Sequence, residues 1–141
     1  MYASGGNYRI ELVDGLTRWF VWARPDVDSA AGARFAEEQA VHSSTLSCGV
    51  SRGLLFDLSA APTVMGPRTQ AAVAATLVPW ERVKKPVGIV ISDNALQRLQ
   101  LERIVREHLA KAGRVFTEQA AALLWLGSRP RGADQVLGRE G

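Results

Sequence analysis

The feature that most constrains the fold is the stretch 53–69, which reads GLLFDLSAAPTVMGPRT. Residues 54–58 form an almost continuous apolar run interrupted only by Asp57, and such a run is typical of a strand covered on both faces. Gly66 and Pro67 then fit a helix start, because proline is well tolerated at the first helical position. The stretch therefore predicts a buried strand, a short loop and a helix.

The flanking sequence predicts further strands and helices in alternation. Alternating apolar residues predict a strand at 8–12, and Asp14-Gly15 predicts a two-residue hairpin turn before a second strand. Strands are also expected at 17–23, 87–91 and 115–116, and helices at 29–41, 67–85, 94–112 and 118–126. The order β-β-α-β-α-β-α-β-α predicts one α/β domain, with a mostly parallel sheet, an antiparallel leading hairpin and helices packed against it.

Several finer features follow from local patterns. The first helix is expected to turn Ala31 and Phe35 inward, and residues 42–49 are expected to form a loop. Pro79 is expected to kink or end its helix near Val78, because it has no N–H for the helical hydrogen bond. Gly113 and Gly127 are expected to stop the last two helices.

The expected organisation is a flexible N-terminus at 1–7, a domain at 8–127 and a flexible tail at 128–141. The first strand, at 8–12, is expected near a sheet edge. An exposed edge strand can pair with a second copy of the chain, so a homodimer is one expected assembly.

Composition limits the partners and the compartment. The chain has 141 residues, of which 47% are apolar and 22% charged, so it is long enough to bury a core. The net charge of +3 makes a weak case for nucleic acid as a partner. Cys48 is the single cysteine, which excludes an intramolecular disulfide. Neither a charged leader nor an apolar run long enough to cross a bilayer is visible, so we expect a cytoplasmic protein without stable membrane insertion.

Five sequence features together resemble a known family. They are the strand at 54–58, the helix start at 66–70, Trp80 with Lys84 and Lys85, the strand at 87–91, and the closing segment of 115–117 with Trp125-Leu126. In these features the chain resembles the bacterial STAS/SEC14-like (SpoIIAA-like) domain proteins, which are related to anti-sigma-factor antagonists. The resemblance covers roughly residues 8–126, and it implies a STAS-like single domain.

The resemblance implies a non-enzymatic module that acts in bacterial signalling by binding another protein, such as a kinase or regulator. In the antagonists, a serine at the corresponding helix start is phosphorylated, and the added charge controls a complex. Here those positions are occupied by Met65, Gly66, Pro67 and Arg68. Both serines of the motif are therefore absent, and the resemblance does not imply that form of phosphorylation.

The partner-binding site is expected at the loop that follows strand 54–58 and at the neighbouring strand end. A helix N-terminus beside Arg68 suits an anionic group of a partner, although a capped helix with a solvated arginine explains the same residues more simply. Met65 would add an adaptable apolar contact. The candidate binding residues are Ser59, Thr63, Met65, Gly66, Arg68, Thr69 and Asp93.

Two other functions remain open at this point. The SEC14 comparison implies binding of a small apolar ligand or lipid, which would need an apolar cavity of several hundred Å³. An enzyme that uses Asp57 and Asp93 ranks last, because Asp57 also suits a turn and Asp93 a helix cap. The spacing of His42, Cys48 and His108 does not suit a metal site or a catalytic dyad, and no cofactor is expected.

Overall fold

The structure is a computed structural model that describes residues 1–128. The expected tail at 128–141 therefore lies, after its first residue, outside the described residues. The strands are β1 (Ala3–Ser4), β2 (Tyr8–Val13), β3 (Leu16–Trp22), β4 (Leu54–Ala60), β5 (Val87–Val90) and β6 (Gly113–Phe116). The helices are α1 (Ser29–Ala40), α2 (Ser43–Ser47), α3 (Pro67–Arg82), α4 (Ala95–His108) and α5 (Gln119–Ser128).

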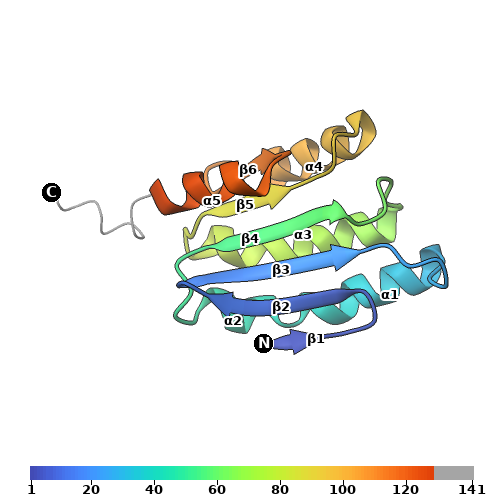
Figure 1. The fold of residues 1–141 in the computed structure, drawn as a ribbon, viewed down its shortest axis with the longest axis horizontal. Helices are drawn as coiled ribbons and strands as arrows, with labels where there is room; N and C mark the ends of the chain where they lie inside the picture. The colour runs from blue at the N-terminus through green and yellow to red at the C-terminus, as the bar shows by residue number, and fades with distance from the viewer. Residues whose placement is uncertain (129–141) are drawn as a thin grey trace, which may run out of the picture.

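The six strands form one mixed sheet in the order β1-β2-β3-β4-β5-β6 (Figure 1). The first three strands are antiparallel, and β3 to β6 are parallel to one another. Asp14 and Gly15 form the predicted hairpin turn, with φ of 55° and 77°, in the left-handed region that such turns require. The α/β class, the leading antiparallel hairpin and the parallel remainder are as expected.

The two faces of the sheet are covered unequally. One core cluster joins β2 to β5 with α2, α3 and α4, and it contains the fully buried Trp19, Phe56, Leu77 and Trp80. A smaller cluster under α5 contains Leu16, Leu55, Val90, Ala122 and Leu126. In Figure 1, α5 lies on the viewer's side of the sheet and the other helices lie behind it.

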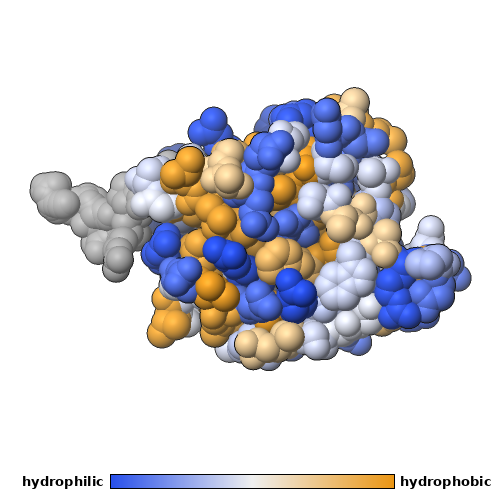
Figure 2. Space-filling model, in the orientation of Figure 1, coloured by the Kyte–Doolittle hydropathy of each residue, from blue (hydrophilic) through white to orange (hydrophobic). Residues whose placement is uncertain are grey.

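The sheet surface beside α5 is not covered by a helix. Figure 2 shows hydrophilic and hydrophobic residues side by side on this face. On β2, Arg9 pairs with Glu11 at 3.0 Å, and its guanidinium lies 4.7 Å from the ring centroid of Phe20 on β3. Polar and aromatic groups thus share the solvent-facing side of the hairpin.

Helix α1 does not present the expected face to the core. Ala33, Ala36 and Gln39 are buried, whereas Ala31 and Phe35 are only half-buried. The reason is a polar contact, because the indole nitrogen of Trp19 donates to Gln39 Oε1 at 2.5 Å. The prediction for α1 placed only apolar side chains toward the core, so it did not include the buried Gln39.

The structure is helical at two places where the sequence favoured a loop or allowed a helix end. The segment read as a loop contains α2, whose Ser43 donates to the backbone oxygen of Thr76 and accepts from the Trp80 indole at 2.8 Å. Helix α3 continues through Pro79 to Arg82. Burial of Trp80 and its bond to Ser43 hold the turn that follows the proline, although Pro79 itself cannot donate.

The expected glycine stops are also displaced. Helix α4 ends at His108, and Gly113 opens β6 instead. A Cβ at Gly113 would lie 2.7 Å from Leu109 Cδ1, so the glycine allows a close approach after the helix. Gly127 lies inside α5, which runs to Ser128.

The N-terminal segment, expected to be loose, contains β1. Ala3 pairs with Ile10 and Ser4 with Arg9, so β1 occupies the outer side of β2 at these residues. The homodimer expectation assumed that the outer edge of β2 is free. Part of that edge is instead paired with β1 of the same chain.

Candidate functional site

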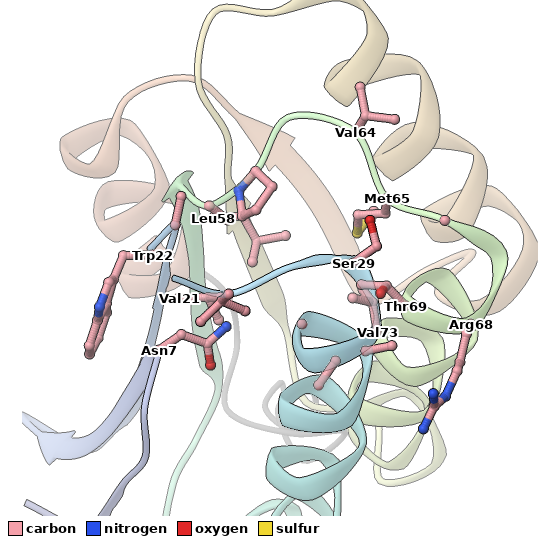
Figure 3. A pocket seen from close by; sticks show the side chains of 18 of the residues that line it. Asn7, Val21, Trp22, Ser29, Leu58, Val64, Met65, Arg68, Thr69 and Val73 are labelled. Atoms are coloured by element: carbon pink, nitrogen blue, oxygen red, sulfur yellow. The ribbon is translucent and has the colours of Figure 1, made fainter. Parts of the chain in front are cut away.

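A cavity of about 440 Å³ lies at the C-terminal edge of β3 and β4, between the first turns of α1 and α3 (Figure 3). This is the right-hand end of the sheet in Figure 1. Its volume falls within the roughly 300–1,000 Å³ typical of small-molecule sites, and this edge of an α/β sheet is where ligands commonly bind. Mostly apolar side chains line it, including Val21, Ala33, Phe56, Leu58, Met65 and Val73.

The space follows from small residues on one wall. On β4, Phe56 and Leu58 point to this side, because alternate side chains of a strand share a face. On α1, the facing positions are Gly32, Ala33 and Ala36. Small side chains opposite ordinary strand residues leave a volume that neither element fills.

Three buried polar groups that line the cavity are bonded to the protein. Gln39 accepts from Trp19 and donates to the Phe35 carbonyl at 3.3 Å. Thr76 donates to the Ala72 carbonyl at 3.0 Å. Gln97 accepts from Ser92 and donates to the Leu58 carbonyl at 3.1 Å. These satisfied groups stabilise the wall and are not free for a ligand.

Asn7 differs from these groups. It precedes β2, lines the cavity and is only 7% exposed. Its Oδ1 is buried without a hydrogen-bond partner among the described residues, and its side-chain amide makes no bond within that part of the chain. A buried polar group without a partner costs roughly 1–3 kcal/mol, so such a group calls for an explanation.

Two helices begin at the cavity opening. Asp28 caps α1 by accepting from the backbone N–H of Ala31 at 2.8 Å. Helix α3 begins after Gly66, which has no side chain to cap it. The positive ends of both helix dipoles therefore lie at this opening.

An ion pair joins the two helices across the opening. The Arg68 guanidinium donates from Nε and Nη2 to the two carboxylate oxygens of Glu37, both at 2.7 Å. This hydrogen-bonded pair lowers the pKa of Glu37 and raises that of Arg68. Both side chains are exposed, so the pair is screened by solvent and positions α3 against α1 only weakly.

The opposite side of the opening carries a second ion pair. Arg24 pairs with both oxygens of Asp26, and it also donates to the Gly6 carbonyl at 2.8 Å. The hydrogen bond from Arg24 lowers the pKa of Asp26. Arg24 thereby ties the segment before Asn7 to the end of β3.

The backbone of Met65 holds the loop over the cavity. Its N–H donates to Gln100 Oε1 at 3.1 Å, and its carbonyl accepts from Gln70 at 2.8 Å and from Gln100 at 3.1 Å. Glutamines on α3 and α4 thus fix a loop that would otherwise lack backbone partners. At the loop tip, Val64 is 57% exposed.

The structure divides the predicted site residues into two groups. Met65, Gly66, Arg68 and Thr69 line the cavity together. Ser59, Thr63 and Asp93 are not among the described residues that line it.

Asp57 is explained by a turn. Its Oδ1 accepts from the Ser59 N–H at 2.9 Å and hydroxyl at 2.6 Å, and its Oδ2 accepts from Gln119 of α5 at 3.1 Å. The side chain therefore faces α5, on the other side of the sheet from the cavity. Asp93 is exposed, and Asn94 caps α4 in its place by accepting from Gln97 at 2.8 Å. Of Ser92, Asp93 and Asn94, which were expected to supply this cap, Asn94 does so, and the cap interpretation of Asp93 is wrong.

Two further kinds of feature are absent from residues 1–128. In that range, no group of three His, Cys, Asp or Glu residues is placed to hold a metal ion. No helix among the same residues is long and apolar enough to cross a membrane.

Sequence reasoning missed Asn7 and the small-residue face of α1. The repeated Ala and Gly residues of α1 were a visible signal for space beside the sheet. Asn7 carried no comparable signal, because an asparagine in a glycine-containing terminal segment ordinarily suits a turn.

Comparison with known proteins supports the fold. No family model and no curated protein matches the sequence. Among solved structures, the NMR structure of the protein TM1081 aligns with a TM-score of 0.58 and 12% sequence identity, covering 92% of this chain and 95% of that one. At this identity, the likeness shows a shared fold alone.

Proposed function

We propose that this chain binds a small, largely apolar molecule in the cavity between α1, α3 and the C-terminal ends of β3 and β4, without catalysing a reaction. The observation that carries the proposal is the apolar-lined volume of about 440 Å³. The cavity opens to solvent, and open, mostly apolar clefts of this size are where small molecules commonly bind. A space of this size at the ligand-binding edge of an α/β sheet is best explained by an occupant.

The opening suits entry of such a molecule. The loop over the cavity is held at Met65 by two glutamines, and its exposed Val64 lies beside the opening. A loop fixed at one residue and exposed at the next can move locally while the sheet stays in place. We assign the protein to the STAS/SEC14-like group and to the cytoplasm as part of the same proposal.

Titration of the 141-residue protein with 1-octanol tests this function. Amide resonances followed by NMR are expected to shift saturably around the cavity, in α1, α3 and the end of β4. Ala33→Leu should weaken the response, because the added carbon groups take up part of the space, whereas Leu99→Ala, at an exposed position on α4, should preserve it. Absence of saturable shifts up to the solubility of 1-octanol would overturn the proposal.

A second candidate is the regulatory protein–protein interaction that the STAS resemblance implies. The observation in its favour is the exposed Val64 at the loop tip, next to Met65 and Arg68. An exposed apolar side chain flanked by a charged residue is a common element of a transient interface. On this reading, the partner is a kinase or other regulator that docks on the loop.

Charge exchange separates a contact with a partner from an internal role of Arg68. Arg68→Glu should abolish capture of the partner, but it also sets two carboxylates against each other at Glu37. The double exchange Arg68→Glu with Glu37→Arg restores the internal pair. If capture from the native host stays lost in the double exchange, Arg68 contacts the partner. Unchanged capture by both variants would exclude Arg68 from the interface.

A further inference from the structure

The unbonded amide of Asn7 identifies one polar feature of the ligand. Building on the proposed function, we propose that the ligand carries a single uncharged hydrogen-bonding group, such as a hydroxyl or a primary amide, that pairs with the Asn7 side chain. The rest of the molecule is apolar and lies against Val21, Leu58 and Val73.

Asn7 is placed to make this contact. Figure 3 shows its side chain beside Val21, on the strand side of the cavity and facing the start of α1. The residue is 93% buried, as its exposure of 7% implies, and neither amide atom is bonded within residues 1–128. Rotation about the last side-chain torsion can turn either the donor or the acceptor toward the cavity, because that torsion is broad. A ligand hydroxyl can accept from the NH₂ group or donate to the oxygen, whichever of the two faces the cavity.

The charges around the opening favour an uncharged group. Arg24 is paired with Asp26 and Arg68 with Glu37, and the Asp28 carboxylate accepts from the α1 backbone. Three carboxylates and two guanidinium groups leave one negative charge, which the two helix N-termini, each worth about +0.5, offset. An added charge would thus gain little attraction there and would lose its hydration on entering the apolar cavity.

The volume sets the size of the molecule. A cavity of about 440 Å³ corresponds to roughly 15 water-sized groups at about 30 Å³ each. A ligand of roughly 8–15 non-hydrogen atoms therefore fits, which corresponds to a medium-chain alcohol or amide. A full-length phospholipid would exceed the space.

Four octyl probes test the inference: octane, 1-octanol, octanoate and octylammonium. We expect 1-octanol to bind roughly tenfold or more tightly than either charged probe, because each charge must be desolvated without a partner. Binding of 1-octanol should also shift the side-chain NH₂ resonances of Asn7. This readout needs no variant.

Variants at Asn7 complete the test. Asn7→Leu should weaken 1-octanol roughly fivefold to tenfold, the value of one hydrogen bond, and should leave octane unchanged or tighter. Asn7→Ser keeps a hydroxyl and serves as the second variant if the leucine does not fold. Asn94→Ser is the matched control, because Asn94 caps α4 without being among the described residues that line the cavity, and serine also caps well.

The outcomes distinguish the two proposals. Cavity shifts with both octane and 1-octanol, without any effect of Asn7→Leu or any movement of the Asn7 NH₂ resonances, would refute the role of Asn7 and keep the proposed function. Tighter binding of octanoate than of 1-octanol would likewise refute it. Failure of all four probes to shift the cavity amides would overturn both proposals.

Discussion

Filling the cavity should stabilise the protein. Ala33 lies on the inner face of α1, is 2% exposed and lines the cavity. Replacing it with leucine adds three carbon groups to that space. In a protein whose core is already filled, the same change would force neighbouring side chains out of their preferred rotamers.

The expected gain follows from the buried groups. Each added carbon group contributes about 0.8 kcal/mol on burial, which gives about 2.4 kcal/mol for three. Ordering the leucine side chain costs about 0.5–1 kcal/mol. Ala33→Leu should therefore raise the free energy of unfolding by about 1.5 kcal/mol, which corresponds to about 6 °C in Tm for a domain of this size.

The assay is urea unfolding of the ligand-free protein, with calorimetry as a second readout. Ala122→Leu on α5 is the matched control, since Ala122 is fully buried in the smaller cluster and is not among the described cavity residues. That control should lose about 1–3 kcal/mol by overpacking. If Ala33→Leu loses a similar amount, the space beside α1 does not exist in solution and the reasoning fails.

Three further changes test other parts of the account. Gly32→Ala should raise the free energy of unfolding, measured by urea unfolding, by about 0.5–1 kcal/mol, because glycine inside a helix is costly. An added Cβ would have its nearest neighbour at 3.9 Å, so it fits without a clash. A lower free energy of unfolding in the variant would contradict the open space beside α1. Ser43→Ala should lower the free energy of unfolding by about 1–3 kcal/mol in the same measurement, because the buried indole N–H of Trp80 loses its acceptor. An unchanged free energy of unfolding would contradict this and would mean that water replaces the hydroxyl. Burial, with the hydrogen bond to Glu38, raises the pKa of Tyr8 to about 12, above its ordinary 10.0. The neutral phenol thus stabilises the fold fully below pH 10, and this contribution is lost as the pH rises toward and through 12. Unfolding from pH 8 to 12 should therefore show a smaller alkaline loss in Tyr8→Phe than in the wild type, and equal losses would contradict it.

The α/β class and most of the order of strands and helices along the chain were predictable because they depend on long, consistent patterns. The apolar run at 54–58 and the strand at 87–91 each follow from several neighbouring residues that agree. The hairpin at Asp14-Gly15 was predictable because its turn needs positive φ angles, which few residue types other than glycine, asparagine and aspartate adopt readily. Tertiary contacts reinforce such signals and do not oppose them.

The errors arise where tertiary contacts oppose the local signal. Gln39 turns inward because Trp19 supplies a donor from β3, far away in the sequence. Helix α3 passes Pro79 because Trp80 is held by Ser43. Neither contact can be read from the residues next to it, so the local rules gave the wrong face for α1 and did not show that α3 would continue beyond Pro79.

The candidate site was predicted only in part. The loop and helix start at Met65, Gly66, Arg68 and Thr69 were found because a strand end followed by a helix start marks this edge of the sheet. The cavity itself depends on what α1 places opposite β4. A volume that is left unfilled between two elements has no signature in either sequence segment alone.

The most direct test is a crystal structure of the protein grown with 1-octanol. The account predicts an open cavity between α1 and α3, with density for one octyl chain and its hydroxyl within hydrogen-bond distance of the Asn7 amide. A cavity closed by inward movement of α1, with Asn7 bonded to the protein and no density for the probe, would contradict it.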